Sequence, residues 1–153
     1  DDLISLPDTL EKTIHKALEN NLWVFGMEYS LMSSNKTLSN IVKEYTDKNF
    51  SDKRANKRPD LLLASDITER FLLIEFKRPS HKLTRDDKNQ AIKYRDDLDR
   101  VLQGKIDILV IGQSIDQRIS SHYENTGVKM ISYTHLINKA RNELNWLIKE
   151  LKR

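Results

Sequence analysis

Acidic and basic side chains interrupt two apolar segments within residues 58–80, and these charged residues have the types and spacing best suited to chemistry. Asp60 opens the first segment, and Glu75 and Lys77 lie in the second. Alternation along a strand places Glu75 and Lys77 on one face, about 7 Å apart at about 3.3 Å per residue. A hairpin turning at residues 67–68 would set Asp60 opposite Glu75 on that same face. We therefore expect the three side chains to converge, whereas a register slip of one residue would turn Asp60 away.

Two neighbouring carboxylates repel each other, and a divalent cation between them relieves this repulsion. Mg²⁺, with Mn²⁺ as the alternative, needs one or two carboxylates beside waters and phosphate oxygens. Such a cation polarises a phosphodiester and acidifies a water; Lys77 could orient that water, help to deprotonate it, or neutralise charge on the phosphate. The alternative interpretation is an ion pair between Glu75 and Lys77 on an exposed sheet face. The apolar run from Leu72 to Ile74 is more typical of an interior strand and favours the metal site.

Basic side chains flank this stretch and are candidates for contacts with nucleic-acid phosphates. Arg58 precedes the apolar segments, and Arg78, His81, Lys82 and Arg85 follow them. Two basic clusters around one hairpin could form a phosphate-binding patch, although a net charge of +3 does not by itself indicate nucleic acid. Solvated loops are the alternative interpretation, with His81 as an ordinary surface residue.

Hydrophobic periodicity indicates the elements that must position these residues. We expect helices over residues 5–21, 80–104, 114–127 and 134–153, and strands over residues 22–33, 60–65, 69–77, 106–112 and 128–133. Residues 35–58 stay open between a loop and a short helix around 38–45. This order predicts an α/β fold in which a mixed sheet lies between helices.

Some positions predict how these helices begin, end and pack. Thr84 and Asp87 form a capping-box pattern, Gly104 is typical of a helix end, and Thr134 is the expected cap of the last helix. The last helix is expected to bury an apolar stripe made of Leu136, Ile137, Ala140, Leu144, Leu147, Ile148 and Leu151.

Together these motifs resemble the PD-(D/E)XK nuclease superfamily. Its Pro-Asp and acidic-X-Lys signature stands here as Pro59-Asp60 and residues 75–77, and its Gln-X-X-X-Tyr motif as Gln90 and Tyr94. The resemblance covers roughly residues 6–112 and is strongest to the Shedu-type nuclease domains of bacterial antiphage proteins. It implies a restriction-endonuclease-like mixed β-sheet flanked by helices, with an α-β-β-β-α-β core and a C-terminal α-β-α extension. For Gln90 and Tyr94, an amphipathic helix with a half-buried tyrosine is the alternative interpretation.

The resemblance also implies an activity, namely metal-dependent endonuclease cleavage of DNA phosphodiester bonds in antiphage defence. Asp60 and Glu75 would then bind Mg²⁺ or Mn²⁺, and Lys77 would be catalytic. Gln90 and Tyr94 would belong to the catalytic site at its rim.

A glutamate of the first helix often completes the metal site in such nucleases. Glu11 is the candidate here, and Glu19 and Glu28 are the alternatives. Residues 36–57 match no pattern of the family.

Composition sets the expected context. The 153 residues suffice for one domain, which we expect to span residues 1–153. Cysteine is absent, which excludes disulfides and cysteine-bound zinc, and no apolar run reaches membrane-spanning length. We expect a cytoplasmic protein with no membrane partner. Because the chain begins at Asp1 without methionine, we interpret it as a piece of a longer protein, with DNA, the other domains of that protein and further copies of this chain as candidate partners.

Two other functions remain as alternatives to the enzyme. One is a catalytically silent module on the same fold that binds nucleic acid or oligomerises. The other is an interaction domain whose last helix pairs with other subunits through Leu144, Trp146, Leu147 and Leu151.

Overall fold

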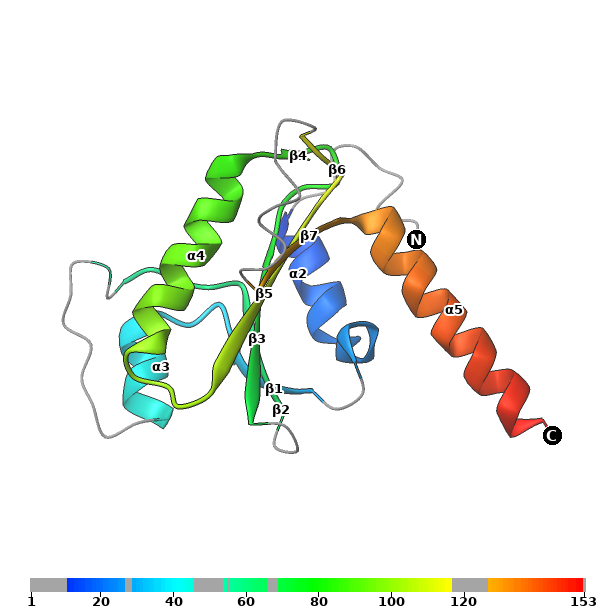
Figure 1. Cartoon of the computed structure of the whole chain (residues 1–153), viewed down its shortest axis with the longest axis horizontal. Coiled ribbons are helices and arrows are strands. Elements are labelled where there is room, and N and C mark those ends of the chain that lie inside the picture. The colour runs from blue at the N-terminus through cyan, green and yellow to red at the C-terminus, as the bar shows by residue number, and fades with distance from the viewer. Residues whose placement is uncertain are drawn as a thin grey trace.

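The computed structural model describes residues 11–26, 29–45, 54, 56–65, 69–116 and 127–152. Along the chain the elements are α2 (Glu11–Glu19), the 3-10 helix η1 (Leu22–Phe25), β1 (Ser30–Ser34), α3 (Leu38–Tyr45), β2 (Leu61–Ser65), β3 (Arg70–Phe76), β4 (Lys82–Leu83), α4 (Arg85–Asp99), β5 (Lys105–Gly112), β6 (Ser114–Ile115), β7 (Val128–Ser132) and α5 (Tyr133–Leu151). Figure 1 shows the sheet between two helical layers, with α3 and α4 on one side and α2 and α5 on the other. Within this part of the chain, no helix combines the length and apolarity needed to cross a membrane.

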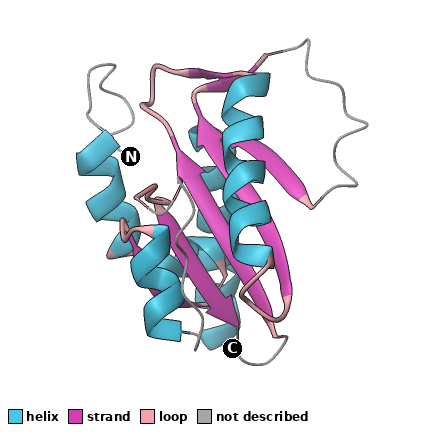
Figure 2. Ribbon diagram, turned by 90° about the vertical axis from the view of Figure 1, so that its left-hand side faces the viewer, coloured by secondary structure: helices cyan, strands magenta, loops and turns pink. Residues whose placement is uncertain are grey.

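A mixed sheet forms the centre of the fold. Within the described residues it has five strands in the order β1-β2-β3-β5-β7 (Figure 2). β1, β2 and β3 pair antiparallel, whereas β3, β5 and β7 pair parallel, and β4 and β6 form a separate short ribbon. β1 lies at one edge, and its register against β2 shifts between Leu31 and Ser33. The expected mixed sheet flanked by helices is thus confirmed, and the arrangement is consistent with a restriction-endonuclease-like fold.

The β2–β3 hairpin has the register that the sequence predicts. Leu61 pairs with Ile74 and Ala64 pairs with Phe71, so the same alignment sets residue 60 opposite residue 75. The turn that joins the strands, residues 66–68, lies outside the described residues. A continuous register without a slip is what brings Asp60 to the face of Glu75.

Apolar side chains pack on both faces of the sheet. Leu62 and Leu73 pack with residues of α3 and α4 on one face, and Ile74 and Phe76 pack with residues of α2 and α5 on the other. Alternation along β3 therefore assigns Glu75 to the α4 face, together with Leu73.

The expected strand over residues 22–33 is wrong in its first part. Leu22–Phe25 form a 3-10 helix, which Gly26 closes with its N–H donating to the Trp23 carbonyl at 3.1 Å. Gly26 has φ 134°, a conformation that ends the turn and that other residues rarely adopt, so β1 begins later, at Ser30. Within residues 35–58, where a loop and a short helix were both open, the short helix is found as α3. Its Leu38 and Ile41 are fully buried.

Several expected helix boundaries also differ. α4 ends at Asp99, before the expected end at Gly104. Gly104 instead packs against the backbone before β3: it has φ +129°, and a Cβ there would lie 2.5 Å from the Glu69 carbonyl oxygen. The cap of α5 is Ser132, whose hydroxyl accepts the His135 N–H at 3.1 Å, so the prediction of Thr134 is wrong.

The remaining helix predictions are tested only in part. The helix expected over residues 114–127 begins instead with β6, and residues 117–126 lie outside the described part. The first helix is confirmed as α2, while residues 1–10 are not described.

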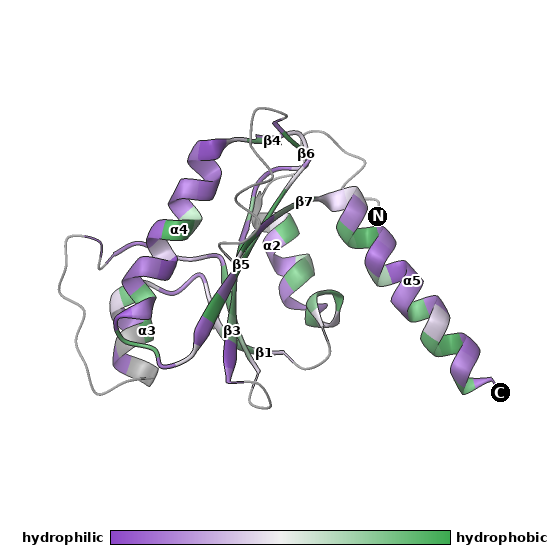
Figure 3. Ribbon diagram, in the orientation of Figure 1, coloured by the Kyte–Doolittle hydropathy of each residue, from purple (hydrophilic) through white to green (hydrophobic). Residues whose placement is uncertain are grey.

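The buried stripe expected along α5 is wrong in its outer half. Leu136 and Ala140 are buried, but Leu144, Ile148 and Leu151 are 42 %, 42 % and 77 % exposed. The reason is geometric, because α5 continues past the end of the sheet and leaves the body of the domain (Figure 1). Hydrophobic residues nevertheless recur along the whole helix (Figure 3).

Candidate functional site

Asp60 and Glu75 each bond to the backbone of the other's segment. The Asp60 N–H donates to Glu75 Oε1 at 3.0 Å, and the Phe76 N–H donates to Asp60 Oδ2 at 3.0 Å. These reciprocal bonds form because Asp60 lies just before β2, opposite Glu75 in the hairpin. The structure therefore brings together the two carboxylates that the sequence predicts to converge.

The surroundings of the Glu75 carboxyl disfavour its ionisation. Burial raises the pKa of Glu75 well above its ordinary value, and the charge of Asp60 and a hydrogen bond between the two carboxyls raise it further. The Asp60 N–H and the charge of Lys77 act in the opposite direction and lower this pKa. Glu75 is 9 % exposed, so water does little to relieve the repulsion between two ionised carboxylates.

This donor set suits a hard divalent cation. Two adjacent carboxylates that resist double ionisation gain stability when a cation neutralises both, and Mg²⁺ completes its shell with waters and phosphate oxygens. Among the side chains that the structure describes, no group of three His, Cys, Asp or Glu residues is arranged to hold a metal ion. Asp60 and Glu75 therefore stay candidates for two of the ligands, without a described third.

Lys77 follows β3, and its backbone is bonded on both sides. Its N–H donates to the Ile111 carbonyl at 2.9 Å, and its carbonyl accepts the hydroxyl hydrogen bond of Tyr133. Its Nζ lies 3.8 Å from Asp87 Oδ1. Because its charge also lowers the pKa of Glu75, Lys77 stands within electrostatic reach of the carboxylate pair.

Asp87 lies close to Lys77, although the sequence pattern identifies it only as part of a helix cap. Its Oδ2 accepts the Thr84 N–H at 2.9 Å and the Thr84 hydroxyl at 3.2 Å, and lies 2.7 Å from His81 Nε2. Burial pushes the pKa of Asp87 upward, but hydrogen bonds with His81 and the Thr84 N–H, and the charges of His81 and Lys77, outweigh burial and lower it. The capping-box spacing locates Asp87 at the start of α4, but no local pattern reveals its proximity to Lys77.

Tyr94 borders the carboxylate pair from α4. Its hydroxyl donates to the Arg58 carbonyl at 3.2 Å, and the Arg54 guanidinium lies 5.6 Å from its ring centroid. Burial raises the pKa of Tyr94, and the charges of Glu75 and Asp60 raise it further. Both carboxylates therefore act electrostatically on the Tyr94 hydroxyl. Tyr94 is half-buried, as the alternative interpretation of an amphipathic helix also expects, and its catalytic role stays a prediction.

Gln90, the other residue of that motif, lies at the surface. It is exposed and lines a polar hollow of about 490 Å³, together with Asp86, Asn89, Ile92 and Lys93. The hollow runs along α4 and does not include the carboxylate pair among its lining residues.

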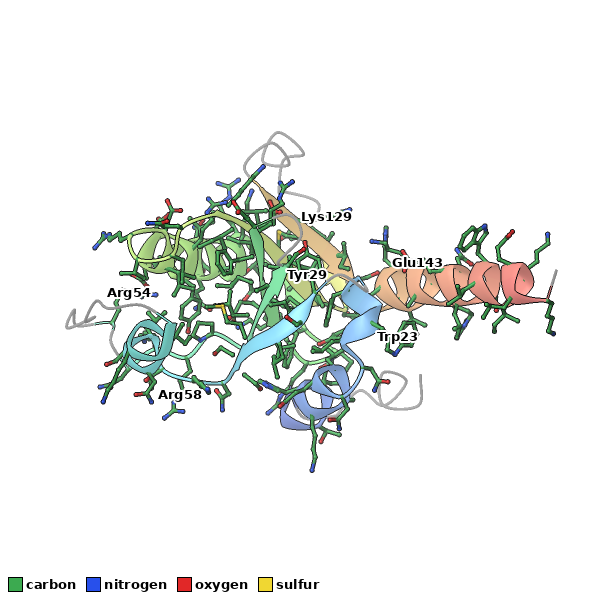
Figure 4. The ribbon with its side chains drawn as sticks, turned by 90° about the horizontal axis from the view of Figure 1, so that it is seen from below. Trp23, Tyr29, Arg54, Arg58, Lys129 and Glu143 are labelled. Atoms are coloured by element: carbon green, nitrogen blue, oxygen red, sulfur yellow. The ribbon has the colours of Figure 1, made fainter. Side chains whose placement is uncertain are left out.

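The predicted phosphate contacts lie in different places around the site. The Arg58 guanidinium donates to the Asn35 carbonyl at 3.0 Å, and Figure 4 shows Arg58 and Arg54 beside α3. His81 pairs with Asp87, as described above. The exposed members of the set are Arg58, Arg78, Lys82 and Arg85. Contact of any of them with phosphate stays a prediction.

The acidic residue that would complete a metal site is not identified. α2 packs through Ile14 on the face opposite the carboxylate pair, and Glu19 Oε2 accepts the Ser34 hydroxyl at 2.9 Å. The side chain of Glu11 and all of Glu28 lie outside the described part of the chain.

Comparison with known families identifies the chain. Residues 8–104, more than half of the 153, match the family model described as Shedu protein SduA, C-terminal. The chain belongs to this family. The span matched to the Shedu family contains Asp60, Glu75, Lys77, Asp87 and Tyr94, and its end precedes β5. Membership in the Shedu family supports a role in antiphage defence. No curated protein matches the chain closely enough to identify a further relative.

Proposed function

We propose that this Shedu-family domain is a metal-dependent endonuclease that hydrolyses DNA phosphodiester bonds in the cytoplasm, as part of antiphage defence. The observation that carries the proposal is the reciprocal bonding of Asp60 and Glu75, with the charge of Lys77 acting on Glu75. A protein that merely binds nucleic acid has no need to keep a buried carboxylate close to a second one at a cost in electrostatic repulsion.

Each side chain has a task in such a reaction. Asp60 and Glu75 would hold Mg²⁺ or Mn²⁺, and when bound the cation polarises the phosphodiester and acidifies a water. Lys77 would place its positive charge against the phosphate as negative charge develops there. Tyr94, with its raised pKa, would stay protonated at neutral pH, and its bond to the Arg58 carbonyl would hold the ring at the rim of the site.

A second candidate is a catalytically silent module that binds nucleic acid or assembles with other subunits or with further domains of a larger protein. The outer half of α5 favours it, since Leu144, Trp146 and Leu151 are 42 %, 63 % and 77 % exposed. Large exposed apolar side chains on one helix are typical of interaction surfaces.

The deciding experiment compares wild type with Lys77→Ala on plasmid and linear DNA, with RNA in parallel, in Mg²⁺ or Mn²⁺. Lys129→Ala, which removes an exposed lysine from β7, is the matched control. We expect cleavage by wild type and by Lys129→Ala, and strong loss in Lys77→Ala. Equal cleavage by Lys77→Ala would refute the role of Lys77, and DNA binding without cleavage by any variant would favour the second candidate.

A further inference from the structure

We propose that Asp87 is a positioning residue that holds the Lys77 ammonium next to the Asp60–Glu75 pair. This inference rests on the proposed nuclease function and adds to it a side chain on another element, the first turn of α4. Asp87 would act through Lys77 and would not touch the phosphodiester itself.

The two oxygens of the Asp87 carboxylate have separate partners. Oδ2 takes the Thr84 N–H, the Thr84 hydroxyl and the His81 ring nitrogen, at 2.9, 3.2 and 2.7 Å. Oδ1 lies 3.8 Å from Lys77 Nζ. Capping of α4 therefore uses one oxygen, and the other oxygen is directed at the lysine.

His81, one of the partners of Asp87, is held in place by bonds that do not involve Lys77. The His81 N–H donates to the Arg78 carbonyl at 2.9 Å, and the Gln113 N–H donates to the His81 carbonyl at 2.8 Å. The loop that carries His81 also packs directly on Gly112, where a Cβ would come within 2.9 Å of the His81 carbonyl oxygen. A carboxylate held in this way provides a rigid counter-charge for a long, flexible side chain.

The distance between Asp87 Oδ1 and Lys77 Nζ indicates an electrostatic attraction without a direct hydrogen bond. At 3.8 Å the pair is longer than the roughly 2.7–3.2 Å of an N–H···O hydrogen bond, so the lysine keeps its donors for other partners. The side chains of Lys77 and Asp87 are 23 % and 9 % exposed, so solvent screens their attraction less than it would at the surface. Asp87 thus restricts where the ammonium can go while leaving it able to reach a phosphate.

Kinetics of Asp87→Asn, with Asp86→Asn as the matched control, separate the contact with Lys77 from the general negative charge of the first helical turn. Both variants remove one acidic charge from the first turn of α4, and of the two residues Asp87 is the one that lies 3.8 Å from Lys77 Nζ. The asparagine at position 87 can still accept the Thr84 N–H but has no charge. We expect Asp87→Asn to lower kcat by about 10- to 100-fold while KM for DNA changes little, and Asp86→Asn to retain near wild-type kcat. Equal loss of kcat in both variants would show that the contact of Asp87 with Lys77 has no special role.

A double-mutant cycle on stability tests the Lys77–Asp87 contact without any cleavage. Urea unfolding of Lys77→Met, Asp87→Asn and the double variant should give non-additive changes in the free energy of unfolding. Additive changes would overturn the inference even if the enzyme cleaves DNA. If wild type does not cleave at all, the proposed function fails, and the catalytic role of Asp87 fails with it, whatever the cycle shows.

Discussion

The hydroxyl of Tyr133, in the first turn of α5, donates a hydrogen bond to the carbonyl oxygen of Lys77 at the end of β3. Tyr133 is 1 % exposed, and the Lys77 N–H is bonded on its other side to Ile111. The last helix is therefore attached directly to the residue that we propose to be catalytic. Loss of the Tyr133 hydroxyl should therefore be felt at the site.

Tyr133→Phe is expected to lower both stability and cleavage. It leaves the buried Lys77 carbonyl without this donor, which should cost about 1–3 kcal/mol in the free energy of unfolding measured in urea. Cleavage should fall because the backbone of Lys77 loses an anchor. Ser132→Ala is the control: it removes the cap of the same helix at a cost of about 0.5–2 kcal/mol without touching Lys77, and it should leave kcat unchanged. Unchanged cleavage in Tyr133→Phe would contradict the coupling.

Glu75→Gln is expected to make the metal-free protein increasingly stable, relative to wild type, as the pH rises. The pKa of Glu75 is raised in the folded state by burial and by the charge of Asp60, so folding favours its protonated form. The contribution of this group to stability is therefore complete below its ordinary pKa and is lost as the pH rises through the raised pKa. The amide does not ionise, yet it can still accept the Asp60 N–H.

Urea unfolding in EDTA from about pH 4 to about pH 8 measures this trend, since the range begins near the ordinary pKa of glutamic acid. The two proteins should be most alike at the acid end. A wild type that gains stability over Glu75→Gln toward alkaline pH would show that the carboxyl is not destabilised by ionisation.

Mg²⁺ or Mn²⁺ is expected to raise the Tm of wild type, and more strongly at higher pH, because the cation binds the ionised pair. At a free concentration about 100-fold above Kd the stabilisation is about 2.7 kcal/mol. For a domain of this size that corresponds to roughly 5–10 °C. Thermal unfolding monitored by fluorescence measures the shift, which Asp60→Asn and Glu75→Gln should abolish. A full shift in either variant would place the cation elsewhere.

The same assay can locate a further ligand. Glu11→Gln should reduce the metal-induced shift if Glu11 completes the site, whereas Glu19→Gln should not, because Glu19 Oε2 already accepts the Ser34 hydroxyl at 2.9 Å. The reverse result would exchange the two assignments.

Lys82→Ala is expected to weaken DNA binding similarly for all sequences and to reduce its salt dependence. Removing one lysine that binds a phosphate should lower the slope of log K against log salt by about 1. Lys129→Ala, again an exposed lysine, should leave the slope unchanged. Titrations at several salt concentrations measure the slopes, and equal slopes for wild type and Lys82→Ala would place the DNA away from this loop.

The sequence predicts the β2–β3 hairpin well because its information is local. Alternation assigns the faces of Glu75 and Lys77, and one turn sets the alignment, so the convergence of Asp60 with Glu75 follows from a few residues. The strands β5 and β7 were also predictable, since each is a short segment dominated by Val, Ile, Leu and Met.

Contacts between distant elements could not be predicted in the same way. Asp87 carries a clear local signal as a cap, and that signal is satisfied whether or not Lys77 lies beside it. The bond from Tyr133 to Lys77 joins residues far apart in sequence, and no spacing rule relates them. Periodicity along α5 likewise shows which side chains share a face, but it does not show whether anything covers Leu144 or Leu151.

The irregular edge of the sheet has a consequence for assembly. Among the described strands, β1 stands at one edge of the sheet, and its alignment with β2 shifts between Leu31 and Ser33. A shift of this kind bends and twists a strand locally, so a straight foreign strand would fit poorly beside it and end-to-end growth of sheets from this side is disfavoured. Self-association of the protein is thereby directed toward other surfaces, and cross-β stacking through β1 is resisted by the backbone itself.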